Sequence, residues 1–175
     1  MDPLQRLLDE ARRDQAVEAR AHEHWLRRAA REGATLTGAL VDLAESGQPA
    51  SVRIASGHVH HGRVVAVGTD FCAVETDGGV VVYISLSALG EVRLDPGAPP
   101  TGNRAPTVDM TLAEALGRVA DDRPRVAAVT RGMDAPMSGE LCAVGADVLT
   151  VKLEGGRLAL VAVAALTQLS VFASG

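Results

Sequence analysis

The stretch at residues 62–74, GRVVAVGTDFCAV, returns at residues 139–151 as GELCAVGADVLTV. When residues 62–94 are aligned with residues 139–171 without a gap, ten of the thirty-three pairs are identical. A composition this rich in Ala, Val and Gly would give roughly three identities by chance. The chain therefore contains two copies of one small unit.

Each copy is expected to begin with a short helix. Upstream of the aligned stretch the register shifts by one residue, so that Thr35 matches Thr111. In the first copy, apolar residues recur at helical spacing over residues 36–45. In the second copy, Thr111 and Glu114 have the spacing of a capping box, which predicts a helix starting at the next residue.

Five short strands are expected after each helix. Glycines, serines and aspartates break the apolar runs at the positions where hairpin turns need them. The predicted strands cover residues 50–55, 58–67, 71–76, 80–84 and 91–94 in the first copy, and 126–130, 138–144, 148–153, 158–162 and 168–172 in the second.

The repeated motif contains glycines at predicted bends. Gly62 and Gly139 are each expected where a strand bends sharply, since the closest backbone approach needs a residue without Cβ. Replacing Gly139 by Val is therefore predicted to destabilise the second unit by a few kcal/mol. The turn after each bent strand is predicted from glycine and aspartate, whose carboxylate can accept a hydrogen bond from a turn N–H. These turn residues are Gly68 with Asp70, and Gly145 with Asp147.

A polar helix is predicted before the two units, and a proline- and glycine-rich linker between them. Asp2 and Pro3 fit a helix start, and the apolar positions up to residue 32 are too sparse for a buried helix. This helix is expected either to lie on the units through its Trp25 end or to pair antiparallel across a dimer. The predicted organisation is a long helix at 1–34, a first unit at 35–95, a linker at 96–108 and a second unit at 109–175.

The composition excludes several classes of protein. The 175 residues carry 17 Lys and Arg against 22 Asp and Glu, a net charge of −5, which disfavours non-specific attraction to phosphate backbones. Cys72 and Cys142 occupy non-equivalent positions and are interpreted as small apolar residues. No signal peptide or membrane-spanning run is seen. We expect a cytoplasmic protein with no membrane contact and no cofactor.

The pattern of a helix and five short, bent strands resembles the Sm-like family, which includes the bacterial Hfq type, and related SH3-like small barrels. The resemblance is carried by Gly62-Arg63-Val64 with Asp70, and by Gly139-Glu140-Leu141 with Asp147. It implies a mainly β fold with helices (α+β), in which the long N-terminal helix precedes two tandem helix-plus-five-stranded Sm-like barrels.

The same resemblance implies a nucleic-acid site. The family lines an RNA pocket with an Asn and a base-stacking residue near the start of the third strand. Phe71 matches the stacking position and could stack on a base, whereas the Asn is absent from both copies. Arginines cluster in the second unit and form the candidate nucleic-acid-binding face, although acidic residues lie beside them. The cluster consists of Arg118, Arg123, Arg125 and Arg131.

A histidine cluster is the candidate metal site. His58 and His60 would project from one face of a strand, as half of a metal site. The alternative is a solvated or dimer-facing strand edge that protonates near pH 6. No third ligand is identifiable from the sequence.

Two functions remain open at this point. No nucleophile with a base, no paired carboxylates and no phosphate loop is recognised, so we expect no enzyme and no small-molecule substrate. One hypothesis is a structural or adaptor protein that assembles through strand edges and the long helix as a homo-oligomer, with a dimer as the expected state. The other is a pseudo-symmetric ring that binds RNA or DNA.

Overall fold

The computed structural model describes residues 32–96, 102, 106–133 and 135–173, together with residues 20, 23–25 and 28. The predicted N-terminal helix therefore falls mostly outside the described residues, although residues 20, 23–25, 28 and 32 are helical. Most of the predicted linker also lies outside them.

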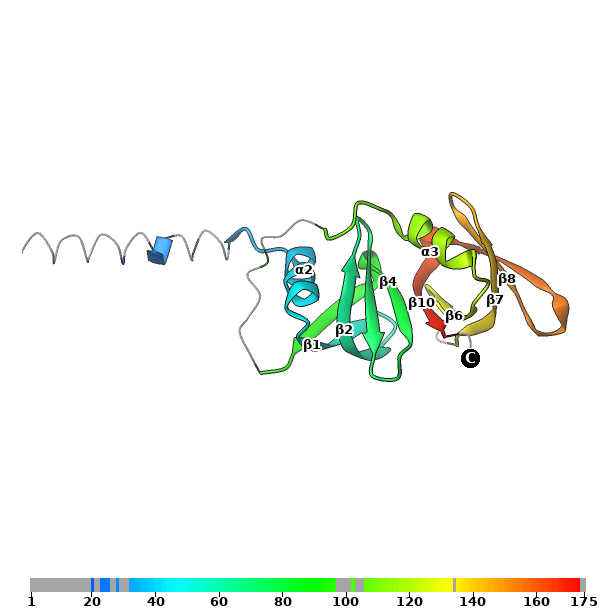
Figure 1. Cartoon of the computed structure of the whole chain (residues 1–175), viewed down its shortest axis with the longest axis horizontal. Helices are drawn as coiled ribbons and strands as arrows, with labels where there is room; N and C mark the ends of the chain where they lie inside the picture. Colours follow the sequence, from blue (N-terminus) through cyan, green and yellow to red (C-terminus); the bar gives the residue numbers. More distant parts are fainter. Residues whose placement is uncertain are drawn as a thin grey trace, which may run out of the picture.

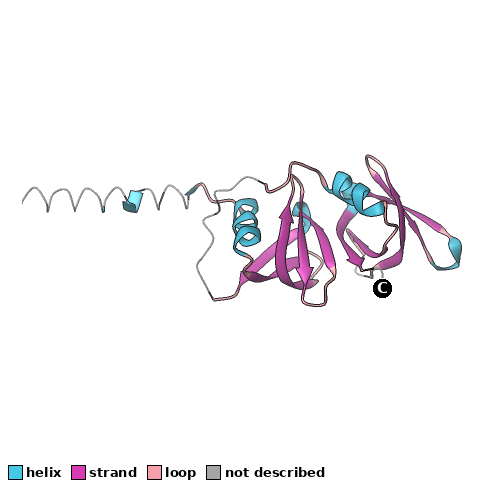
Figure 2. Cartoon of the chain, viewed as in Figure 1, coloured by secondary structure: helices cyan, strands magenta, loops and turns pink. Residues whose placement is uncertain are grey.

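Ten strands form one antiparallel sheet in the order β5-β1-β2-β3-β4-β10-β6-β7-β8-β9. Strands are the commonest regular element of the described chain (Figure 2). In the first repeat they are β1 Pro49–Ile54, β2 Val59–Val67, β3 Phe71–Thr76, β4 Val81–Ser85 and β5 Leu89–Leu94. In the second they are β6 Arg125–Thr130, β7 Met137–Val144, β8 Val148–Lys152, β9 Leu158–Ala162 and β10 Leu166–Phe172.

The predicted fold class of a long N-terminal helix and two tandem helix-plus-five-stranded Sm-like barrels is wrong. The structure describes no long N-terminal helix, and the ten strands belong to a single sheet rather than to two separate units. The physical reason is that β4 of the first repeat pairs with β10 of the second, as Figure 1 shows. This pairing satisfies backbone N–H and C=O groups of β4 and β10 that would be unpaired at the edges of two separate units.

The predicted strand positions are confirmed, with ends that differ by no more than two residues. A single 3-10 turn, η1 Leu86–Ala88, precedes the fifth strand of the first repeat, and its counterpart in the second repeat is η3 Val163–Ala165. A further turn, η2 Glu154–Gly156, joins β8 to β9. The local sequence pattern thus located the strands, but it did not predict which strands pair between the two repeats.

Two short helices begin with threonine caps. The Thr35 side chain accepts from the Gly38 N–H before α2 Leu36–Ser46, which ends at Gly47 with φ 64°. Thr111 and Glu114 form the predicted capping box before α3 Leu112–Ala120. These side chains satisfy N–H groups that the first helical turn leaves without partners.

The bend glycines lie where two strands approach closely. A Cβ on Gly62 would lie 2.8 Å from the Glu75 carbonyl carbon, and one on Gly139 would lie 2.7 Å from Val151 Cγ1. In both cases a backbone oxygen of the facing strand lies closer still. Backbone cannot move aside as a flexible side chain can, so the close approach at Gly62 and Gly139 leaves no room for a Cβ.

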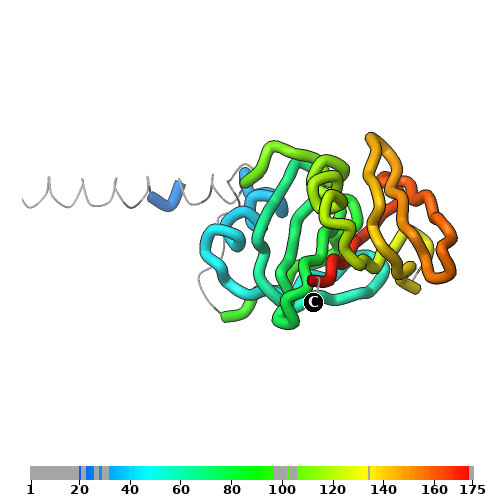
Figure 3. The backbone as a smooth tube through the Cα atoms, turned by 45° about the vertical axis from the view of Figure 1, so that its right-hand side comes forward, coloured from blue at the N-terminus to red at the C-terminus, as the bar shows by residue number. Residues whose placement is uncertain are grey.

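Two clusters of buried apolar residues form the core. One lies within the first repeat and includes Leu40 and Val52. The other fills the second repeat but also takes in Phe71 and Ala73 from β3 of the first. The core of the second repeat therefore continues across the junction between β4 and β10. The tube in Figure 3 follows the chain from α2 in cyan to β10 in red.

Candidate functional site

The internal junction is an antiparallel ladder between β4 and β10. Tyr83 faces Leu169, and Val81 faces Val171. Both Val81 and Tyr83 are half-buried and pack against the core cluster of the second repeat. The ring centroids of Tyr83 and Phe71 are 6.0 Å apart, and burial raises the pKa of the Tyr83 hydroxyl. The junction is therefore an apolar contact as well as a backbone ladder.

The segment before α3 is tied to the end of β2. Met110 O accepts the Thr69 N–H at 3.0 Å, and the Thr107 hydroxyl lies 2.9 Å from the Val67 N. Asp70 Oδ1 accepts the Leu112 N–H at 2.6 Å. The sequence had predicted that Asp70 would accept an N–H of its own turn. In the structure Asp70 instead caps the helix of the other repeat. These bonds place α3 against the first repeat.

The turn residues of the second repeat are more open than those of the first. Gly68 is buried, since a Cβ there would meet the Phe71 ring and lie 2.7 Å from Met110 O. Gly145 is exposed, and a Cβ there would meet only Val148. The Asp147 side chain has no hydrogen-bond partner within the described part of the chain.

The two end strands of the sheet expose apolar side chains. Within the described residues, β5 pairs with β1 alone and β9 pairs with β8 alone. Leu158 and Leu160 on β9 are 64% and 74% exposed, and Leu94 on β5 is 38% exposed. Strand β9 lies in the orange part of Figure 1, at the end of the molecule opposite α2. A strand that has one unpaired edge and exposed leucines is a site for adding another strand.

The sequence did not single out Leu158 or Leu160. A predicted strand carries no mark of being at an edge, because edge position depends on which strands pair. The signal that was available is composition, since LALVA in β9 contains no charge or proline, whereas exposed edges are usually protected by such residues.

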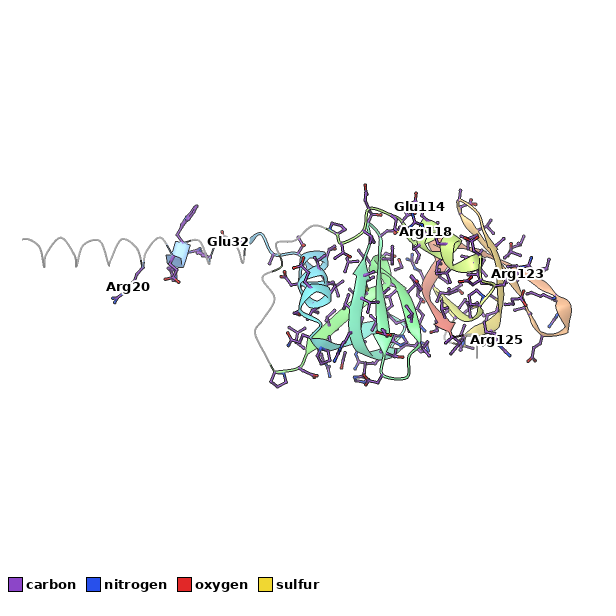
Figure 4. All side chains as sticks on the ribbon, viewed as in Figure 1. Arg20, Glu32, Glu114, Arg118, Arg123 and Arg125 are labelled. Atoms are coloured by element: carbon purple, nitrogen blue, oxygen red, sulfur yellow. The ribbon has the colours of Figure 1, made fainter. Side chains whose placement is uncertain are left out.

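The predicted nucleic-acid residues do not form one surface. Phe71 is 1% exposed inside the core, so a base could stack on its ring only if the core opened. Arg118 lies on α3, Arg123 follows that helix, and Arg125 begins β6 (Figure 4). Arg123 lies 3.9 Å from a Glu140 carboxylate oxygen.

Arg131 points elsewhere, toward the first repeat. Its guanidinium donates to the Ser87 hydroxyl at 3.4 Å, across the junction between the repeats. Glu114 faces Arg118, and its bonds to Thr111, together with that arginine, lower the pKa of its carboxyl. The arginine cluster is therefore divided among helix, strand and junction positions, with acidic neighbours.

The predicted metal ligands have protein partners instead. His58 Nδ1 lies 3.0 Å from the Ser56 hydroxyl, and His60 Nε2 lies 2.5 Å from Gln168 Oε1. Among the described residues no three His, Cys, Asp or Glu side chains converge on one point. Because Gln168 is buried on β10, His60 connects the first repeat to the second.

A shallow cleft lies beside the internal junction. Its volume is about 440 Å³, and apolar residues from both repeats line it, among them Val65, Tyr83 and Met110. Arg118 and Asp122 are its charged lining residues. The cleft follows from the way α3 meets β3 and β4, so it belongs to the junction.

A comparison with protein-family models finds no match for this chain, and a comparison with curated proteins finds none either. In the described part of the chain, no helix is both long enough and apolar enough to cross a membrane.

Proposed function

We propose that the protein is a non-catalytic structural or adaptor protein that assembles with other protein chains through the exposed edges of its sheet. The observation that carries this proposal is the exposure of Leu158 and Leu160 on an end strand. Strand addition would pair the free backbone groups of β9 and remove these leucines from water in one step.

Charge also favours a protein partner. The chain carries a net charge of −5, and β9 contains no charged residue. Nucleic-acid binding depends on Lys and Arg that displace counterions from phosphates, so the exposed edge has the wrong chemistry for that ligand. An apolar strand edge instead fits another strand.

The test is a measurement of molar mass in solution over a range of protein concentrations, with the ratio of absorbance at 260 and 280 nm. We expect mass to rise with concentration and the ratio to be that of protein alone. Leu160→Lys should weaken association about tenfold or more, because it places a charge in an apolar contact.

Met133→Lys is the matched control. Met133 is also an exposed apolar side chain, but it lies in the turn between β6 and β7, so this variant should associate as the parent does. A monomer at every concentration, or copurified nucleic acid that salt removes, would contradict the proposed function.

A further inference from the structure

The two repeats offer two equivalent strand pairings, β4 with β10 and β9 with β5, and only the first is made within the chain. Under the alignment of residues 62–94 with 139–171, β9 of the second repeat corresponds to β4, and β5 of the first corresponds to β10. Strands β4 and β10 pair within the chain, whereas β9 and β5 are the two ends of the sheet. The two end strands, β9 and β5, are therefore equivalent to the two strands that pair at the internal junction.

We propose that β9 of one copy pairs with β5 of a second copy of this chain, in the register of the internal junction. This inference rests on the proposed function and names its partner. Tyr83 faces Leu169 and Val81 faces Val171 within the chain. The corresponding pairs between copies are Leu160 with Val92, and Leu158 with Leu94.

The exposed leucines of β9 support this register. Val81 and Tyr83 are half-buried against the core cluster that spans the junction, whereas Leu158 and Leu160, their equivalents, are exposed. The pairing also brings Leu158 opposite Leu94, which is itself exposed on β5. Two apolar side chains that are separately in water would then cover each other.

The helices show the same difference between equivalent positions. Leu112 on α3 is 2% exposed and lies in one core cluster with Phe71 of the first repeat. Its equivalent Leu36 on α2 is 47% exposed, and the equivalent of Phe71 is Val148, which is only half-buried. In the proposed contact, α2 of the second copy brings Leu36 onto Val148, as α3 brings Leu112 onto Phe71.

A polar contact fits the same arrangement. Asp70 Oδ1 accepts the N–H of Leu112, the first residue of α3. Asp147 occupies the equivalent turn and, among the described residues, has no hydrogen-bond partner for its side chain. The Leu36 N–H of a second copy is the equivalent donor, and a carboxylate at a helix start also opposes the helix dipole favourably.

One difference between β5 and β10 must be accommodated. Glu91 and Arg93 stand where β10 has Gln168 and Ser170. Arg93 donates to Glu91 at 2.7 Å, and Arg53 lies 3.3 Å from the same carboxylate. Because the charges are already paired along β5 itself, strand addition leaves no uncompensated carboxylate opposite β9.

The proposed contact joins two different surfaces, so it repeats from copy to copy. After one pairing, the first copy still has its β5 free and the second its β9. Such head-to-tail contacts give a closed ring when the rotation per copy closes, and an open chain otherwise. The number of copies in the assembly therefore depends on that rotation.

Site-specific cross-linking tests this register in the full chain. Cys142→Ala removes the accessible native thiol, while Cys72 can remain because burial raises the pKa of its thiol to about 12. Leu158→Cys and Leu94→Cys are made separately in that background, coexpressed, and treated with a short bismaleimide. We expect a covalent dimer of the two variants, at a yield roughly tenfold above that of either variant alone.

Two controls accompany the cross-linking. Val81→Cys with Val171→Cys in one chain should give a link within the chain, since those residues face each other at the internal junction. Met133→Cys coexpressed with Leu94→Cys should give no dimer above background, because Met133 lies in the turn between β6 and β7 and not on an end strand. Circular dichroism of each variant checks that it is folded.

The outcomes separate this inference from the proposed function. If Leu158→Cys alone cross-links to itself as efficiently, β9 pairs with β9, and the head-to-tail register is wrong while assembly through strand edges stands. If the chain assembles but the Leu158 and Leu94 variants do not cross-link, the register is again wrong. If the molar mass is that of a monomer throughout, the proposed function itself fails.

Discussion

The internal junction and the two ends of the sheet are built from equivalent strands but have different surroundings. At the junction, β4 and β10 pair and pack against one core cluster, and Asp70 caps the next helix. At the ends, β9 and β5 expose leucines, and the equivalent Asp147 has no described partner. The comparison shows that pairing, not local composition, decides whether such a strand is part of the core or a binding edge.

The largest effect is expected at the close approach of β7 and β8 inside the second repeat, rather than at either end of the sheet. Gly139→Val is expected to lower the free energy of unfolding by about 4 kcal/mol, because the added side chain meets the backbone of the facing strand. Thermal and denaturant unfolding measure this change. Gly117→Ala is the control, since a Cβ at Gly117 meets nothing within 4 Å. An unchanged melting temperature for Gly139→Val would contradict the close approach at that bend.

Alanine substitutions at equivalent positions of β10 and β5 should destabilise the junction more than the end of the sheet. Leu169→Ala removes a fully buried side chain at the junction, with an expected loss of about 2 to 4 kcal/mol. Val92→Ala, its equivalent on β5, should cost about 1 kcal/mol in dilute protein, because Val92 is only half-buried. Denaturant unfolding at low concentration measures both. Equal losses would mean that β5 and β10 have similar surroundings after all.

The equivalent residues Asp70 and Asp147 should differ in their effect on stability, by a smaller amount. Asp70→Ala removes the acceptor of the Leu112 N–H, so unfolding should become easier by about 1 to 2 kcal/mol. Asp147→Ala should leave the stability of dilute protein unchanged, because its side chain has no partner within the described chain. The two melting temperatures check this contrast. A loss of stability on Asp147→Ala in the monomer would contradict it.

The smallest effect is expected from pH at the β5 edge. The Arg93 side-chain hydrogen bond, with the Arg53 and Arg93 charges, lowers the pKa of the Glu91 carboxyl. A carboxyl whose pKa is lowered by folding stabilises the folded state at pH above its unfolded-state pKa. That stability is lost as the pH falls through its folded-state pKa. Glu91→Gln should therefore reduce slightly the fall in melting temperature on acidification. The exposed pair is screened by salt, so a large effect would contradict this interpretation.

The sequence predicted the parts of this fold better than their combination. Alternating apolar residues and turn signals located the strands, and Thr111 with Glu114 located the start of α3. Gly62 and Gly139 were recognisable because a close backbone approach tolerates no side chain. Each of these features depends on neighbours in the chain, which is why local patterns revealed them.

The pairing of β4 with β10 could not be predicted from the same patterns. It joins residues 81–84 to residues 168–171, and nothing in either strand alone specifies the other. The burial of Phe71 and the exposure of Leu160 both follow from that pairing, so the candidate site changed from a base-stacking residue to a strand edge. The long-range hydrogen bond between His60 and Gln168 was likewise outside the reach of local reasoning.

Amide hydrogen exchange of β9 shows whether the sheet ends pair between copies. It is measured on the full chain at low and high protein concentration, with β4 as the internal reference. Strand β4 is paired on both sides within the chain, so its protection should not depend on concentration. We predict that exchange in β9 and β5 slows together as concentration rises, approaching the protection of β4. If exchange in β9 and in β5 stays fast and does not change with concentration, the sheet ends do not bind each other, and assembly through strand edges is contradicted.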